Sequence, residues 1–240
     1  SNQTQIAGAI ILAGVIIAGA VLLKGNTAPR PAEGTPGNVT IAKVDKNDRT
    51  LGNAKAKVAL IMYEDFQCPF CAAISGLVSD TDAIKYLKQK VDPNWTPIMT
   101  GVNEYIKDGT VLFVYRDWAF LGPESVKSAE AARCAGDQGK FWEYHDYLYT
   151  HQNGENQGGF ADPKLKSFAQ SLGLNTSDFD KCLDSGKYTQ TVNDSRTEGT
   201  AAGVTGTPKG FILKDGKIVA TIDGAEPWSA TKPKLDSALK

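Results

Sequence analysis

The sequence contains few metal-binding residues and no excess of either charge. Only two histidines, His145 and His151, and four cysteines occur among 240 residues, which limits metal chemistry. The 26 basic and 27 acidic side chains leave a formal net charge of −1, so nucleic acid is not an expected partner. Glycine and proline, at 24 and 11 residues, are too sparse for a low-complexity chain. The length allows a sizeable core, in one large domain or two small ones.

One apolar segment departs from this average composition. Residues 6–23 read IAGAIILAGVIIAGAVLL, without a charged or polar side chain, and would form a helix of about 27 Å, just long enough to cross a bilayer. A buried core helix and a cleaved signal sequence are the alternatives, but the purity of the run favours an uncleaved membrane anchor over residues 1–24. Residues 25–38, rich in proline and glycine, predict a flexible linker. The folded domain is then expected over residues 39–240.

The patterns beyond the linker alternate between strand and helix types, which predicts an α/β fold interrupted by a block of helices. Residues 79–109 are longer than one helix and a loop require, and no role is predicted for them. The expected elements begin with a strand at Val58–Tyr63 that is buried on both faces, a helix opening after EDFQCPF and a second buried strand at Val111–Tyr115. Helices within 124–185 follow, then a hairpin of Phe211–Leu213 with Lys217–Ile222 and a helix at Pro227–Lys240.

Reactive side chains concentrate at Cys68-Pro69-Phe70-Cys71, directly after the first predicted strand. Cysteines at i and i+3 in the first turn of a helix meet free N–H groups and the positive end of the helix dipole, which stabilise a thiolate. We therefore expect Cys68 to be the exposed nucleophile with a lowered pKa. Cys71, one turn into the helix, is expected to be shielded and to resolve mixed disulfides. Pro69 suits the first turn, where a missing N–H costs nothing.

Two other interpretations of this motif stay open on the residues alone. It could form half of a zinc site, but a structural zinc site needs four ligands, and Cys134 and Cys182 lie far apart without forming a second CxxC. It could also be a purely structural cysteine pair. The strand-to-helix context favours a redox-active pair, with no metal and no cofactor.

Three segments together resemble the DsbA-like thiol-disulfide oxidoreductases of the thioredoxin superfamily: VALIMYEDFQCPFC at 58–71, VTGTP at 204–208 and the helical block between them. A CxxC motif alone is a weak signal, but CxxC with a distant Gly-Thr-Pro before a hairpin is specific. The resemblance covers about residues 39–240. It implies a thioredoxin fold with an inserted α-helical domain at about 122–200, preceded by the N-terminal transmembrane helix.

The resemblance also implies roles for residues outside the motif. Pro208 would be a cis-proline against the cysteine pair, and Thr207 would offer main-chain pairing to an extended substrate. Without the resemblance, a trans proline in an ordinary loop is the more frequent case. Cys134 and Cys182 would form a structural disulfide in the insertion, with two separate buried thiols as the alternative. His145 and the aromatic residues of 141–149 are expected to pack in the core and not to bind a cofactor.

Several positions depart from the family pattern. Met62 stands six residues before the first cysteine, where the fold usually has a buried acid that assists proton transfer. Glu64 and Asp65 lie nearer and could modulate the pKa values of the thiols, but a solvated turn is the simpler interpretation of both. The dipeptide Pro69-Phe70 lacks the histidine of the strongest oxidants. Lys209 follows the expected cis-proline. Its ammonium is expected either to stabilise the Cys68 thiolate, in which case Lys209→Ala should raise the pKa of Cys68, or to attract acidic peptides.

These residues predict an enzyme that donates disulfides to extracytoplasmic proteins. The expected partners are reduced or unfolded secreted proteins, a DsbB-like or VKOR-like membrane reoxidase, and the membrane itself through the N-terminal helix. The charge bias of Lys24 and Arg30 would instead place the domain in the cytoplasm, but four cysteines favour an oxidising compartment. A reductase or isomerase on the same fold, and a tethered peptide-binding or redox-sensing module without turnover, are the alternatives.

Overall fold

The computed structural model describes residues 40–240. The predicted anchor over 1–24 and linker over 25–38 lie outside this range. Within residues 40–240, no helix combines the length and the apolar character that crossing a bilayer demands.

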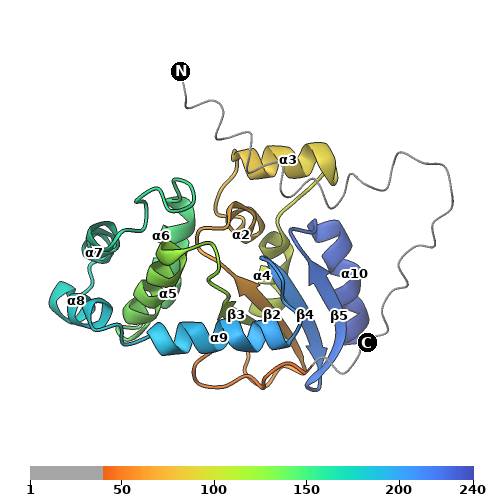
Figure 1. Ribbon diagram of the computed structural model, residues 1–240. Coiled ribbons are helices and arrows are strands. Elements are labelled where there is room, and N and C mark those ends of the chain that lie inside the picture. The colour runs from red at the N-terminus through yellow and green to blue at the C-terminus, as the bar shows by residue number, and fades with distance from the viewer. Residues whose placement is uncertain (1–39) are drawn as a thin grey trace. The chain divides into compact units, whose positions relative to one another are not determined.

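A five-stranded mixed sheet forms the centre of the molecule (Figure 1). The strands lie in the order β1-β3-β2-β4-β5. β2 and β3 are parallel, whereas β1 pairs antiparallel with β3, and β4 pairs antiparallel with both β2 and β5. Their bounds are β1 Arg49–Leu51, β2 Val58–Glu64, β3 Val111–Asp117, β4 Lys209–Lys214 and β5 Lys217–Asp223.

Alternate residues of β2 pack into cores on opposite faces of the sheet, as the period of two in a strand requires. Leu60 and Met62 belong to the larger core, and Ile61 and Tyr63 to the smaller one. All four are buried, which explains why the strand is a continuous apolar run without alternation.

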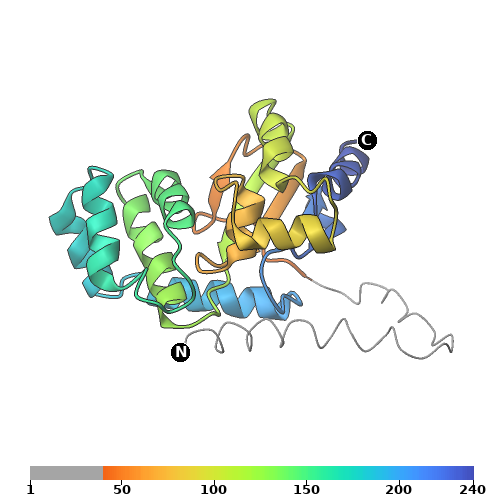
Figure 2. The ribbon, with the colours of Figure 1, turned by 90° about the horizontal axis from the view of Figure 1, so that it is seen from above.

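Helices cover both faces of the sheet. α4 (Ile98–Lys107) and α10 (Trp228–Leu239) lie over one face and α9 (Thr189–Ala201) crosses the other (Figures 1 and 2). The first part of the unassigned segment 79–109 forms α3 (Asp82–Lys90), which packs beside α2 (Pro69–Ser75). The second part of the segment 79–109 forms α4. The close packing of α4 on α10 depends on Gly101, because a Cβ there would lie 2.0 Å from the Trp228 ring.

The helical insertion lies between β3 and β4 and extends to one side of the sheet (Figure 2). α5 and α6 are separated by a short connection in which Gly139 has a left-handed conformation. The side chains of Cys134 on α5 and Cys182 on α8 form a disulfide, so the separate-thiol alternative is wrong. The helices that precede α9 are α5 Pro123–Gly136, α6 Phe141–Thr150, α7 Asp162–Ser171 and α8 Thr176–Asp184.

Removing this disulfide should destabilise the oxidised protein strongly. The cysteines are 48 residues apart in sequence, and the chain-entropy relation gives a loop of that size about 4 kcal/mol. The double variant Cys134→Ser, Cys182→Ser should lower the free energy of unfolding by about that amount in urea denaturation. Because the disulfide is remote from Cys68, the rate of thiol exchange should stay within about twofold. A loss of stability below about 1 kcal/mol would contradict the prediction.

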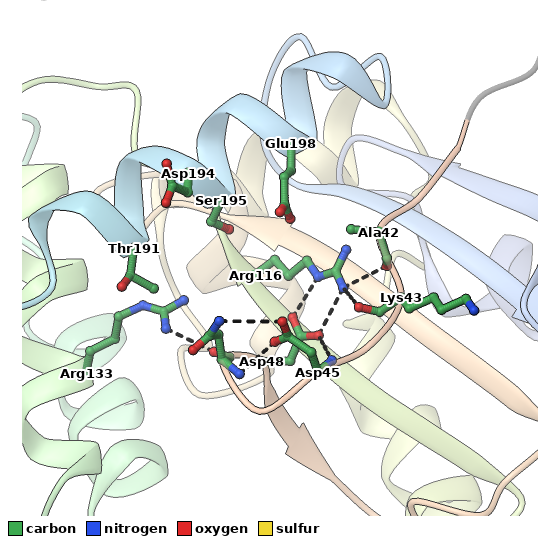
Figure 3. Close-up of a pocket in the computed structure, with 11 residues that line it drawn as sticks. Ala42, Lys43, Asp45, Asp48, Arg116, Arg133, Thr191, Asp194, Ser195 and Glu198 are labelled. Atoms are coloured by element: carbon green, nitrogen blue, oxygen red, sulfur yellow. Dashed lines mark hydrogen bonds and ion pairs between the residues drawn. The ribbon is translucent and has the colours of Figure 1, made fainter.

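The segment of residues 40–48 is tied to the sheet by two buried arginines (Figure 3). Arg116 on β3 donates to both carboxylate oxygens of Asp48, at 2.7 and 2.9 Å, and to the Ala42 carbonyl oxygen at 3.0 Å. Arg133 on α5 donates to the Asn47 carbonyl oxygen at 2.9 Å. These arginines line a polar pocket under α9 that includes neither Cys68 nor Cys71. The segment is therefore part of the folded domain.

Candidate active site

The turn between β2 and α2 is held by Asp65. This carboxylate is buried and accepts hydrogen bonds from the main-chain N–H groups of Gln67 (2.8 Å), Phe120 (2.8 Å) and Leu121 (3.1 Å) and from the Ser125 hydroxyl (2.7 Å). Burial raises its pKa in spite of these four donors. The interpretation of Asp65 as part of a solvated turn is therefore wrong: it joins the turn to the start of the insertion.

The turn leads directly into the cysteine motif. The Cys68 main chain is extended (φ −71°, ψ 117°) and is the N-cap of α2, with Pro69 in the first turn as predicted. Cys68 and Cys71 are both thiols, and only 4% and 0% of their surfaces are exposed. Cys68 is thus far less exposed than the sequence predicts, because Phe66, Thr207 and the insertion surround it.

The two thiols differ in acidity in the predicted direction. The pKa of Cys68 is lowered, chiefly by a hydrogen bond from the Cys71 thiol, with further help from Thr207 and from the main-chain N–H groups of Cys71 and Phe70. Burial opposes this effect. The pKa of Cys71 is raised well above its usual value, first by burial and then by its interaction with Cys68. Cys68 is therefore the better nucleophile and leaving group, and Cys71 retains its proton.

Thr207 and Pro208 lie against the cysteine pair. The Thr207–Pro208 peptide bond is cis, and the Cys68 Sγ lies 3.4 Å from the Thr207 carbonyl oxygen as a thiol donor. The Thr207 hydroxyl is buried and has no hydrogen-bond partner within residues 40–240. It is free to donate to the Cys68 sulfur once the thiolate forms.

Thr207→Val should raise the pKa of Cys68. The substitution keeps the shape and removes the donor; a hydrogen bond to a charged group is large enough to shift a pKa by about one unit. Since the ordinary thiol value is 9.0 and the folded value lies below it, the thiolate of the variant should form at higher pH. The pH dependence of iodoacetamide alkylation of Cys68, in a Cys71→Ser background, measures this shift. Identical titration curves would rule out the Thr207 hydroxyl as a donor.

Phe70, the other residue of the motif dipeptide, is half-buried. Its ring packs edge-on against Tyr86 of α3, with centroids 6.0 Å apart. The segment 79–109, for which no role is predicted, thus contacts the cysteine motif through this pair of aromatic rings. The Tyr86 side chain is 42% exposed.

Glu64 is buried at the end of β2, with 4% of its surface exposed. Its interpretation as part of a solvated turn is also wrong. Glu64 and Met62 are two residues apart on one strand and share a face of the sheet, so the chain has a buried acid one step beyond the position where the family pattern has it. Burial raises the pKa of Glu64, and the charge of Glu64 contributes to the raised pKa of Cys71.

Lys209 does not interact with Cys68. Its ammonium forms an ion pair with Asp223 on β5 and lies 5.2 Å from the centre of the Phe211 ring. The groups with the largest effects on the pKa of Cys68 do not include Lys209. The predicted stabilisation of the Cys68 thiolate by Lys209 is therefore corrected: the neighbouring strand supplies a carboxylate that neutralises the lysine.

Residues of the insertion that the sequence does not predict as site residues contact the cysteine motif or its neighbours. The Gln152 carboxamide donates to the carbonyl oxygens of Phe66 and Cys68, at 2.5 and 3.2 Å. The Asn156 main chain donates to the Gln67 side chain at 2.6 Å, and the Tyr149 hydroxyl donates to Glu64 at 2.6 Å. The available signal was the spacing of His145 and Tyr149, four residues apart, which places them on one face of α6; Gln152 follows the end of that helix.

Residues 40–240 contain no group of three histidine, cysteine or acidic side chains arranged to hold a metal. Cys134 and Cys182 are in a disulfide and cannot serve as thiolate ligands. The half-zinc interpretation of Cys68 and Cys71 therefore has no support from these residues.

A sequence model of the thioredoxin family matches residues 44–91 and 98–231. The chain belongs to the thioredoxin family. The match spans both the cysteine motif and Thr207-Pro208, and it includes the helical insertion.

Two solved structures have a fold similar to that of this chain. BdbD of Bacillus subtilis, in its oxidised form, has a TM-score of 0.64 and 18% identity, over 84% of this thioredoxin-family chain and 97% of BdbD. The α-DsbA1 protein of Wolbachia pipientis has a TM-score of 0.63 and 20% identity, over 82% and 92% of the two chains. The fold is therefore a thioredoxin fold with a helical insertion, similar to the folds of BdbD and α-DsbA1.

Curated relatives match over part of their length. A Salinispora arenicola protein named Na(+)/H(+) antiporter NhaA 1 is 28% identical over 69% of this thioredoxin-family chain and 21% of its own. A Rickettsia prowazekii protein, "Putative protein-disulfide oxidoreductase", is 26% identical over 80% of this chain and 63% of its own. The chain thus spans between about a fifth and two thirds of these relatives.

Proposed function

We propose that this protein is a thiol-disulfide oxidoreductase that donates the Cys68–Cys71 disulfide to other proteins. The observation that carries the proposal is the opposite shift of the two thiols: the pKa of Cys68 is lowered and that of Cys71 is raised. A stabilised Cys68 thiolate favours the reduced enzyme, and therefore favours transfer of the disulfide to the substrate. The name of the Rickettsia relative supports the same activity.

Disulfide donation proceeds in two exchange steps. A substrate thiolate attacks the Cys68 sulfur, the Cys68–Cys71 bond breaks, and its electron pair goes to the Cys71 sulfur, which takes up a proton. A second substrate thiolate then attacks the substrate sulfur of the mixed disulfide and releases the Cys68 thiolate. Cys68 lies against Thr207, whose main chain is positioned to pair with an extended substrate segment.

The compartment and partners follow from this chemistry. A disulfide within the insertion is stable in an oxidising compartment, so we place the domain outside the cytoplasm, tethered by residues 1–24. Reduced or unfolded secreted proteins are the substrates. A DsbB-like or VKOR-like membrane protein reoxidises the pair, and the tether raises the local concentration of the domain near it.

Two assays test this proposal against its alternatives. An oxidative donor should accelerate refolding of a reduced substrate protein whose activity needs disulfides, and should reduce insulin slowly. A reductase should show the reverse. A binding or sensing module should accelerate neither reaction, which would contradict the proposal.

A further inference from the structure

Tyr149 belongs to the helical insertion, but its hydroxyl contacts the redox site. The side chain is 1% exposed, and its hydroxyl donates to Glu64 Oε2 at 2.6 Å. The ring is fixed on one side by Phe66, with centroids 5.2 Å apart, and on another by His145 at 4.8 Å. A buried tyrosine that donates to a buried carboxylate 85 residues away in sequence is a specific arrangement.

Two acids, Glu64 and Asp65, lie at the end of β2, and they differ in the hydrogen bonds that their carboxylates accept. The Asp65 carboxylate accepts four hydrogen bonds, whereas the Glu64 carboxylate accepts one within residues 40–240, from the Tyr149 hydroxyl. Tyr149 is therefore the one hydrogen-bond donor to this carboxylate within residues 40–240. Burial raises the pKa of Glu64, and the nearby His145 and then the hydrogen bond from Tyr149 lower it.

The titratable groups around Glu64 come from each element packed against it. α2 contributes Cys71, whose raised pKa depends partly on Glu64. α6 contributes His145 and Tyr149. β3 contributes Tyr115, whose buried hydroxyl has no partner within residues 40–240, and Asp117, which binds Arg133. Asp65 follows Glu64 directly in the turn after β2.

We propose that Tyr149 is a positioning residue that holds Glu64 ionised beside Cys71, so that Glu64 exchanges the Cys71 proton during thiol exchange. The inference rests on the proposed function, because it concerns a step of that reaction. It assigns to the insertion a part in the chemistry and not only in the shape of the domain.

The proton step balances in both directions. In donation, the Cys68–Cys71 bond breaks and its electron pair goes to Cys71. Glu64 takes up a proton from solvent and passes it to the Cys71 sulfur, which leaves Glu64 ionised again. In reoxidation, Glu64 takes that proton back as the Cys71 sulfur attacks the Cys68 sulfur of a mixed disulfide. The bond from Cys68 to the partner sulfur breaks, and the partner leaves as a thiolate.

A cavity connects Glu64 to the surface away from Cys68. It has a volume of about 150 Å³ and is lined by Glu64, His145 and Asp146 among others. Asp146 is half exposed and lies 2.8 Å from His145 Nδ1. Neither Cys68 nor Cys71 lines this cavity, so the proton of Glu64 can exchange with solvent through it, past His145 and Asp146, without passing the two cysteines.

Tyr149→Phe tests the proposal, because it removes the donor and keeps the ring packing. The reduced protein is mixed with oxidised glutathione, which forms a mixed disulfide at Cys68, and resolution by Cys71 is followed by acid quenching and mass spectrometry across pH. Without the donor, Glu64 keeps its proton to higher pH, so the acidic limb of the rate profile should move up by about one pH unit. Glu64→Gln should remove that limb.

Tyr144→Phe is the matched control. Its hydroxyl is equally buried on α6 but donates to the Leu165 carbonyl oxygen inside the insertion, so its profile should coincide with the wild type. An unshifted profile for Tyr149→Phe, in a variant that unfolds cooperatively and still forms the glutathione adduct, would overturn the inference. If the wild type forms no adduct, the proposed function itself fails.

Discussion

Replacing Cys68 by serine should abolish disulfide transfer. Cys68 carries the thiolate that forms the mixed disulfide, and no other free thiol within residues 40–240 can replace it, because Cys71 is fully buried with a raised pKa. A hydroxyl does not form the sulfur–sulfur bond, so the rate of oxidative refolding should fall to the uncatalysed level, a loss of about 10³-fold or more.

Cys71→Ser is the informative companion of this variant. It keeps Cys68 but removes the resolving thiol, so mixed disulfides between Cys68 and substrates should accumulate and be visible on non-reducing gels. Cys68→Ser, Cys71→Ser should show none. Residual refolding activity in Cys68→Ser, or adducts through Cys71, would reverse the assigned roles of the two cysteines.

Asp65→Ala should produce the second large effect, on stability and activity together. It leaves the N–H groups of Gln67, Phe120 and Leu121 and the Ser125 hydroxyl without their acceptor. Each buried group that loses its partner costs about 1–3 kcal/mol, with partial relief from water. We expect the free energy of unfolding to fall by about 3–5 kcal/mol and the exchange rate to fall with it, since the turn that carries Cys68 loses its support.

Urea denaturation of the reduced protein measures this loss. Asp194→Ala on the exposed side of α9 is the control and should change stability by less than about 0.5 kcal/mol. If Asp65→Ala lowers the free energy of unfolding by no more than the control does, the Asp65 carboxylate does not stabilise the turn.

The sequence predicts those helices, strands and turns that are determined by residues close together in the chain. β2 and β3 are continuous apolar runs because both faces are buried, and Pro69 in the first turn of a helix follows from the missing N–H. The hairpin after Lys209 is predicted by Asp215-Gly216, where both residues have positive φ. The identity of the reactive pair follows from the same local context.

Elements defined by distant contacts are not predictable in this way. α9 reads TQTVNDSRTEGTA and buries little more than Val192, Ser195 and Gly199, so it has almost no apolar periodicity. The three-residue strand β1 also has no recognisable sequence pattern, and it forms by pairing with β3. The burial of Glu64 and Asp65 is decided by Tyr149 and Ser125, which lie 85 and 60 residues away.

The reduction potential of the Cys68–Cys71 pair, measured by equilibration with glutathione, tests the central claim most directly. The lowered pKa of Cys68 stabilises the reduced form at pH values above that pKa, so a disulfide donor is expected. The account predicts a potential less negative than about −200 mV, on the oxidising side of the glutaredoxins. A potential near that of thioredoxin, at about −270 mV, would show that the pair accepts disulfides and would contradict the account.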